Sequence, residues 1–217
     1  MQYDKIAGAP ISWGVCEVPG WGHQMGPERV LREMAELGLK ATEFGPLGFL
    51  PVEATARAKV LNDLDMHATG GFFPVLLHDE THDPLPVVAE ELKSYTASGA
   101  TTLVLAADSG KAGYDEKRSE LTPDQWQTVF KNLNAISALA DSVGVKAVLH
   151  PHVGTIIETH EDVMHVVQGS NIAFCLDTGH MVIGGADPVW FSAEHAKRVA
   201  HSHLKDVDLS WAKQVQA

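Results

Sequence analysis

Residues 121–153, LTPDQWQTVFKNLNAISALADSVGVKAVLHPHV, contain a complete helix signal followed at once by a strand signal. Thr122 is a good N-cap, Pro123 suits the first helical position, and Gln125 completes a capping box. Apolar residues then recur at helical spacing, and the apolar run that ends in two histidines predicts a strand over 145–153. A helix that leads directly into a buried strand is the repeating unit of a parallel α/β fold.

The same alternation of strand and helix extends along the whole chain. One strand signal, TTLVLAAD, is continuously apolar, which is typical of a parallel strand buried on both faces. No Gly-x-Gly-x-x-Gly turn follows the first strand, so a dinucleotide-binding sheet is disfavoured. Strands are predicted at 5–13, 40–45, 67–78, 101–108, 145–153, 172–180 and 199–207.

This pattern predicts an α/β fold of the (β/α)₈ TIM barrel type, with polar residues gathered at the carboxyl ends of its strands. No internal linker or low-complexity tract divides the chain, so residues 1–217 are expected to form a single domain. Only about seven strands are visible where a barrel needs eight, so the last strand and helix are expected to be missing. A truncated form, or closure by a partner or a swapped segment, would each account for this, and homo-oligomer formation stays open.

Charge and composition exclude some kinds of partner. The formal net charge of -12 disfavours nucleic acid and anionic membranes, which require a basic surface. No signal peptide is visible, and no apolar run approaches the length of a membrane span, so a cytoplasmic location is expected. The two cysteines, Cys16 and Cys175, match no zinc or redox spacing and are interpreted as small buried residues.

Histidines and carboxylates recur where predicted strands end. In HPH, His150 and His152 are two residues apart and should face the same side of an extended strand. Carboxylates mixed with imidazoles, with no thiolate in register, suit Mn²⁺, Co²⁺ or Zn²⁺. Such an ion can polarise a carbonyl while a nearby carboxylate or imidazole removes the alpha proton.

Several of these residues also have simpler interpretations. Asp177 could cap the turn that follows it, and Glu158 could simply precede a helix. Glu43 could be an exposed strand residue, and His201 with His203 could face solvent. The HPH pair is harder to explain without a site, because burying two imidazoles without partners is costly.

Six motifs, spread over residues 6 to 208, resemble the xylose isomerase-like sugar isomerase/epimerase superfamily, and within it the inosose dehydratases of inositol catabolism. They are PISWGVCEVPGWG, TEFGPLGFLP, HPHVGTIIET, CLDTGH, ADPVWF and HSHLKDVD. The resemblance implies a (β/α)₈ barrel with a divalent ion, most often Mn²⁺ or Co²⁺, held by carboxylates and histidines.

The resemblance also assigns roles to residues. It implies Asp177 and His203 as metal ligands, with Glu158 as a third ligand, because the strand-five glutamate of related epimerases is His150 here. The last ligand of the family, a glutamate on strand eight, has no counterpart in this sequence. The expected catalytic residues are His152, Glu158 and His180, and the expected substrate-binding residues are Trp13, Glu43, His150 and Lys205.

The leading hypothesis is a metal-dependent lyase that dehydrates a keto-inositol, a small polyhydroxylated ketone. A metal-dependent sugar or keto-sugar isomerase or epimerase would share the proton abstraction. A phosphodiesterase resembling endonuclease IV would need a basic DNA groove, which the net charge disfavours. A non-catalytic, truncated barrel is the remaining alternative.

Overall fold

The computed structural model describes residues 5–16, 18, 20–111 and 120–216. The chain divides into two compact units. Unit 1 holds residues 1–72, 90–103 and 143–145, and unit 2 holds residues 73–89, 104–142 and 146–217.

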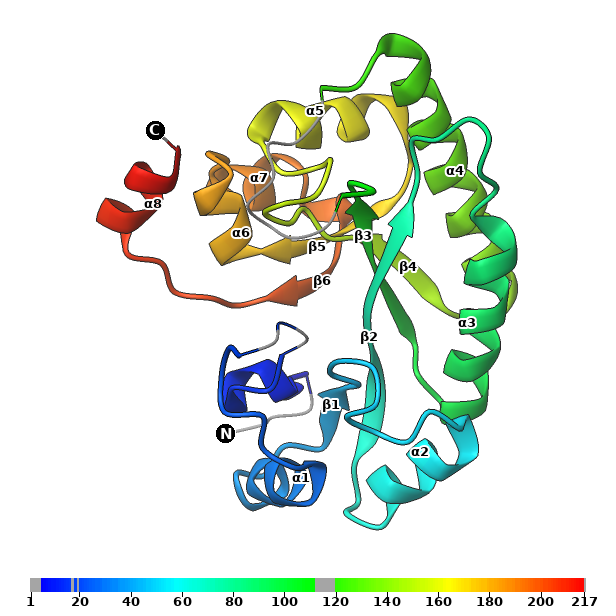
Figure 1. The fold of residues 1–217 in the computed structure, drawn as a ribbon, viewed down its shortest axis with the longest axis vertical. Coiled ribbons are helices and arrows are strands. Elements are labelled where there is room, and N and C mark those ends of the chain that lie inside the picture. Colours follow the sequence, from blue (N-terminus) through cyan, green and yellow to red (C-terminus); the bar gives the residue numbers. More distant parts are fainter. Residues whose placement is uncertain (1–4, 17, 19, 112–119, 217) are drawn as a thin grey trace. The chain divides into compact units, whose positions relative to one another are not determined.

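The strands pair in the order in which they occur in the sequence (Figure 1). The registered pairs β1–β2, β4–β5 and β5–β6 are all parallel. Parallel strands that follow one another through helices are the topology of a TIM barrel. The strands are β1 Ala41–Glu43, β2 His67–Leu76, β3 Thr102–Asp108, β4 Lys146–Leu149, β5 Ala173–Asp177 and β6 Val199–His203.

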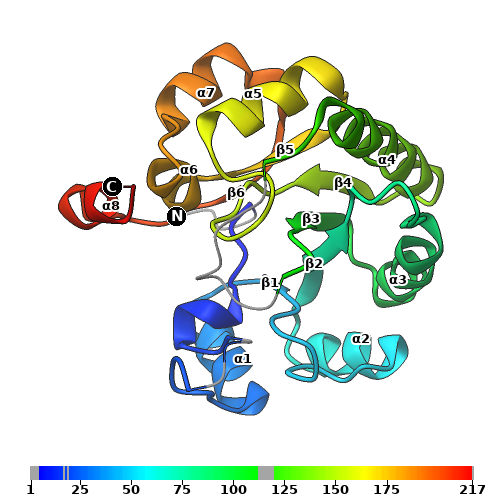
Figure 2. The ribbon, with the colours of Figure 1, turned by 45° about the horizontal axis from the view of Figure 1, so that its top comes forward.

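Helices follow the strands as the alternation predicts. In unit 2, α4, α5 and α7 lie on the outer side of β4 and β5 (Figure 2). The helix α4 begins with the predicted capping box, in which Gln125 N donates to Thr122 Oγ1 and Thr122 N donates to Gln125 Oε1, at 3.3 and 3.0 Å. The helices are α1 Pro27–Glu36, α2 Ala54–Asn62, α3 Leu85–Ser98, α4 Pro123–Ser142, α5 His160–Gly169, α6 Thr178–Ile183, α7 Pro188–Glu194 and α8 Leu209–Gln216.

The strand predicted over 5–13 is wrong. Gly8 makes a single bridge to Thr42, and a 3-10 helix, Pro10–Trp13, follows. Pro10 has no N–H to donate to a sheet and its fixed φ suits the first position of a helical turn, which ends at Gly14 with φ 79°. The described residues therefore form six strands, where seven were expected.

Two further differences lie near the carboxyl end. The strand predicted over 172–180 stops at Asp177, because the Asp177 side chain accepts from Gly179 N and His180 N and starts α6. The segment after 207, for which nothing was predicted, forms α8. None of the described helices is both long and apolar enough to cross a membrane.

The core of unit 2 lies beneath the carboxyl ends of its strands. Val104, Val148, Ala173 and Cys175 form one buried cluster contributed by β3, β4 and β5. Asn132 of α4 reaches the end of β2, where its Nδ2 donates to the Leu77 carbonyl at 2.9 Å in a buried position. Packing and a satisfied buried amide thus fix this end of the sheet.

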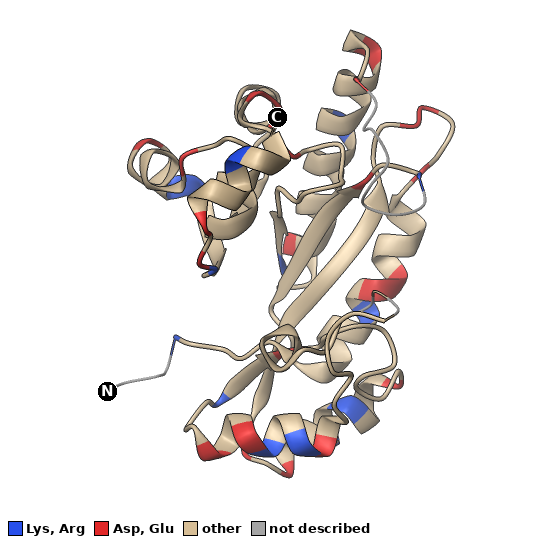
Figure 3. Cartoon of the chain, turned by 60° about the vertical axis from the view of Figure 1, so that its left-hand side comes forward, with Lys and Arg blue, Asp and Glu red and all other residues tan. Residues whose placement is uncertain are grey.

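Unit 1 is held by an aromatic and cationic cluster. Phe44 meets Tyr95 edge to face at 5.2 Å between ring centroids, and the Arg57 guanidinium lies 4.1 Å over the Phe44 ring. Burial raises the pKa of Tyr95, whose hydroxyl donates to Gly71 O. The helix α1 carries both signs of charge (Figure 3), and Arg29 and Glu33 form an ion pair one turn apart.

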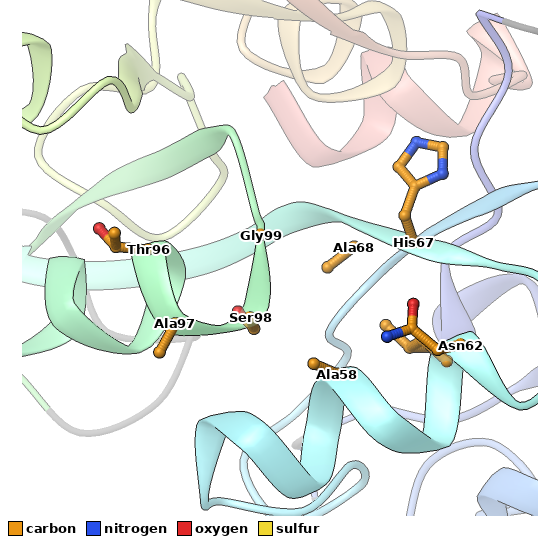
Figure 4. A pocket seen from close by; sticks show the side chains of 9 residues that line it. Ala58, Asn62, His67, Ala68, Thr96, Ala97, Ser98 and Gly99 are labelled. Atoms are coloured by element: carbon orange, nitrogen blue, oxygen red, sulfur yellow. The ribbon is translucent and has the colours of Figure 1, made fainter.

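A hollow of about 370 Å³ also lies within unit 1 (Figure 4). His67 and Ala68 at the start of β2, with the ends of α2 and α3, line it. It lies at the amino end of β2, whereas barrel active sites form at the carboxyl ends.

Arg198 joins the segment after α7 to the loop between α5 and β5. Its Nη2 donates to Ser170 O and Ile172 O at 2.8 and 2.7 Å, and Nε donates to Ile172 O at 3.1 Å. We expect Arg198→Ala to lower the free energy of unfolding by about 2 kcal/mol, because charged hydrogen bonds to carbonyls would be lost. Urea denaturation measures this. The control is Lys197→Ala, at the adjacent exposed residue. An equal loss of stability in both variants would contradict a stabilising role for the Arg198 hydrogen bonds.

Candidate functional site at the carboxyl ends of β4, β5 and β6

Asp177, the last residue of β5, is the centre of the site in unit 2. It is fully buried, and its two carboxylate oxygens have different partners. Oδ1 accepts from Gly179 N and His180 N, both at 2.9 Å. Oδ2 meets His150 Nε2 at 3.0 Å and also contacts the Lys205 ammonium. Asp177 therefore both caps α6, as the simpler interpretation proposed, and faces the imidazoles.

The register of β5 and β6 brings His203 to the same carboxylate. Asp177 pairs with His203 in the sheet, and His203 Nδ1 lies 3.4 Å from Asp177 Oδ2. Thr178 Oγ1 donates to Lys205 O at 2.7 Å and accepts from Lys205 N at 2.8 Å, which fixes the backbone of Lys205 beside α6. Three of the predicted site residues thus meet at one oxygen: His150, His203 and Lys205.

The HPH stretch and the residues after it form a tight, anchored loop. His152 N donates to Ile157 O at 3.1 Å, and Thr155 Oγ1 donates to His152 O at 2.8 Å. Ile156 N donates to Ala107 O at 3.0 Å, which ties the loop to β3. The rings of His152 and His180 come to 3.7 Å between centroids. The predicted proximity of the HPH imidazoles to the CLDTGH motif is therefore present.

Charge states in this site follow from burial and hydrogen bonding. Burial alone would raise the pKa of Asp177, but hydrogen bonds from His150 and His203 and the Lys205 charge hold this pKa well below its usual range. Burial lowers the pKa of His150 to about 4, against the opposing hydrogen bond to Asp177. Burial, and then the neighbouring His152, lowers the pKa of His180 to about 2. At neutral pH, the site therefore holds the Asp177 carboxylate anion beside the neutral imidazoles of His150 and His180.

The donor set fits a divalent ion. His150, Asp177 and His180 each offer a ligand atom, and these atoms lie within 4.8 Å of one another. Imidazole nitrogen and carboxylate oxygen together suit Zn²⁺, Mn²⁺ and Co²⁺. His150, Asp177 and His203 meet at one oxygen and could hold the same ion, provided that Lys205 leaves the carboxylate.

Glu158, predicted as a ligand, has another contact. Its Oε2 accepts from Gly154 N at 2.9 Å and so closes the 152–158 loop. Glu158 is not part of the groups of close metal-ligating atoms found among the described residues of unit 2. Its roles as ligand and catalytic residue remain predictions.

Trp13 and Glu43 belong to unit 1, so the structure does not test their predicted contact with substrate. Trp13 Nε1 donates to Glu33 Oε2 at 2.8 Å. Glu43 is half-buried at the end of β1. Both assignments remain predictions.

Sequence reasoning missed Cys175. The thiol lies two residues before Asp177 on the same face of β5, so the expectation that no thiolate lies in register is wrong. Its sulfur and one nitrogen each of His150 and His203 lie within 4.8 Å of one another. The signal was present in CLDTGH, because cysteine and aspartate at a spacing of two share a strand face.

Parallel strands with a carboxylate and imidazoles at their carboxyl ends define an α/β barrel protein whose polar site lies at that edge of the sheet. The chain belongs to the Xylose isomerase-like TIM barrel family, whose model matches residues 28–215. This confirms the family and the fold class predicted from the motifs.

A curated relative agrees with this family, and solved structures agree with the fold. The chain is 32% identical to an inosose dehydratase of Geobacillus kaustophilus, covering 94% of this chain and 69% of the relative. An L-ribulose 3-epimerase structure matches with a TM-score of 0.69 at 17% identity, over 93% of this chain and 69% of the other. The IOLI protein, solved with a zinc atom, matches with a TM-score of 0.65 at 15% identity, over 85% and 69%.

Proposed function

We propose that this chain carries the metal site of a divalent-metal-dependent hydro-lyase that dehydrates a keto-inositol. The observation that carries the proposal is the meeting of His150, His203 and Lys205 at the buried carboxylate of Asp177. The relative named inosose dehydratase supports this substrate class. The enzyme would act on a small polyhydroxylated ketone in the cytoplasm.

The ion would be held by Asp177 and His203, with His150 or the predicted Glu158 as a further ligand. Mn²⁺ or Co²⁺ is our first expectation, and the zinc atom in the IOLI structure supports Zn²⁺ as an alternative. When bound, such an ion polarises the ketone carbonyl and makes the neighbouring C–H proton more acidic.

Two imidazoles are placed to act on the substrate. His152 Nδ1 lies 2.7 Å from Val153 O, and because a carbonyl can only accept, Nδ1 carries the proton and Nε2 the lone pair. His180 Nδ1 accepts from Val153 N at 3.4 Å, so the neutral ring carries its proton on Nε2. His152 would therefore take the alpha proton as base. The His152 imidazolium would then give this proton to the beta hydroxyl, which leaves as water, and the neutral His180 ring would donate a hydrogen bond to the substrate from Nε2.

Lys205 competes with a divalent ion for Asp177. Its ammonium contacts the oxygen that His150 and His203 also face, and its side chain is 36% exposed. We expect Lys205→Met to raise the affinity for Mn²⁺ about tenfold, because the ion no longer displaces a cation. Isothermal titration calorimetry measures this, and Lys213→Met on the exposed face of α8 is the control. An unchanged or weaker affinity of Lys205→Met for Mn²⁺ would contradict the competition between Lys205 and the ion for Asp177.

An epimerase is the second candidate function. An epimerase would share the proton abstraction by His152 and return a proton to the opposite face of the same carbon from another group. In D₂O, an epimerase incorporates deuterium into a product of unchanged composition, whereas the dehydratase releases water and forms a product lighter by one water.

The deciding experiment incubates the metal-free protein with inosose, with and without Mn²⁺ or Co²⁺, and follows substrate and product by NMR. Metal-dependent loss of water supports the dehydratase, and metal-dependent deuterium incorporation without loss of water supports the epimerase. Metal binding without any turnover would leave the non-catalytic barrel as the function of this chain.

A further inference from the structure

Cys175 forms a second group of potential ligands beneath Asp177. Its sulfur and one nitrogen each of His150 and His203 lie within 4.8 Å of one another. Cys175 is not part of a disulfide and has no exposed surface, and His150 is 2% exposed. The His203 side chain is 18% exposed, so an ion can reach the group past this ring.

The strand register explains why these three side chains meet. Cys175 and Asp177 point to the same face of β5, so the thiol lies one layer deeper than the carboxylate. His150 follows directly after β4, whose last residue, Leu149, pairs with Phe174 of β5. His203 pairs with Asp177 on the other side. The imidazoles of the two neighbouring strands therefore flank both the carboxylate and the thiol.

The spacing is close to what a thiophilic ion requires. Zn–S and Zn–N bonds of about 2.3 and 2.0–2.1 Å at tetrahedral angles separate the ligand atoms by about 3.3–3.6 Å. An approach of about 1 Å, within reach of small side-chain rotations, would complete such a geometry. One thiolate with two imidazoles selects Zn²⁺ or Cd²⁺ over harder ions such as Mn²⁺.

The two positions that an ion could take, one at Asp177 and one at Cys175, also differ in charge. At Asp177, the carboxylate is already paired with the Lys205 ammonium, so an ion must displace that cation. Cys175 supplies a negative charge of its own once its thiol proton is released to solvent on coordination. The two positions share His150 and His203, so both cannot be filled at once.

We propose that Cys175, His150 and His203 form a binding site for a thiophilic divalent ion, Zn²⁺ or Cd²⁺, that excludes an ion from Asp177. An ion bound there takes both imidazoles away from the carboxylate. This inference is independent of the proposed reaction, because it concerns binding alone.

The test is titration of the metal-free protein with Co²⁺ and Cd²⁺, followed by ultraviolet absorption. Sulfur-to-metal charge-transfer absorption should appear and saturate at one ion per chain. It should be lost in Cys175→Ser and in His203→Ala, but retained in Asp177→Asn, which keeps the thiol and both imidazoles. Cys16→Ser is the matched control, since Cys16 is the other cysteine of the chain and lies in unit 1.

Absence of charge-transfer absorption from the wild-type protein would overturn the proposal without recourse to any variant. Absorption that survives in Cys175→Ser, or that disappears in Cys16→Ser, would do the same. Circular dichroism confirms that each variant is folded, and Cys175→Ala provides a second thiol-free variant if the serine is poorly tolerated in the core.

Discussion

Asp177→Asn should abolish inosose turnover and weaken the affinity for Mn²⁺ by more than about 100-fold. Loss of an outer-shell partner alone costs about 10- to 100-fold in metal affinity, and a direct ligand should cost more. The neutral amide removes the negative charge that faces His150, His203 and the ion. Calorimetric metal titration and the NMR assay measure the two effects.

The asparagine variant separates the site from the fold. Its side-chain carbonyl can still accept from Gly179 N and His180 N, so the start of α6 should be kept. Asp187→Asn is the matched control, because Asp187 caps α7 in the same way, through Val189 N and Trp190 N, but is exposed. Tight Mn²⁺ binding by Asp177→Asn, or an equal loss in Asp187→Asn, would contradict the assignment of Asp177 as ligand.

Local signals in the sequence were sufficient for most of the fold. The capping box at Thr122 and the apolar stripe after it predicted α4, and the unbroken apolar run TTLVLAAD predicted β3. Both signals depend only on residues close together in the chain. The folded protein therefore contains the helix and the strand that they predict. The strand expected over 5–13 failed because Pro10 and Gly14 favour a helical turn that the apolar content conceals.

The site could be predicted only in part, for a different reason. HPH and CLDTGH indicated His150 and Asp177, because residue type and strand position were enough to suggest a ligand. One oxygen of the Asp177 carboxylate caps α6 and the other faces the imidazoles, and this arrangement depends on where α6 begins. The sequence pattern placed the end of the strand three residues too late. The role of Glu158 depends on the closure of the 152–158 loop, which joins atoms that no periodic pattern relates.

Gly184→Ala should destabilise the protein by about 3 kcal/mol, as overpacking of a tight contact does. Gly184 ends α6, and a Cβ at this position would lie 2.1 Å from the carbonyl oxygen of Glu158. A backbone atom cannot rotate away as a flexible side chain can, so α6 and the 152–158 loop must separate. Because the loop carries His152 and α6 carries His180, the variant should also weaken metal binding and turnover.

Urea denaturation of Gly184→Ala measures the loss of stability, and metal titration under native conditions measures the effect on the site. Gly26→Ala is the matched control, since no atom would lie within 4 Å of its Cβ. It should cost only about 1 kcal/mol, because alanine is a weaker helix N-cap than glycine but meets no clash at this position. Equal stability of the two variants would show that the loop yields to the added methyl group. The approach of α6 to Glu158 would then not be what positions the imidazole pair.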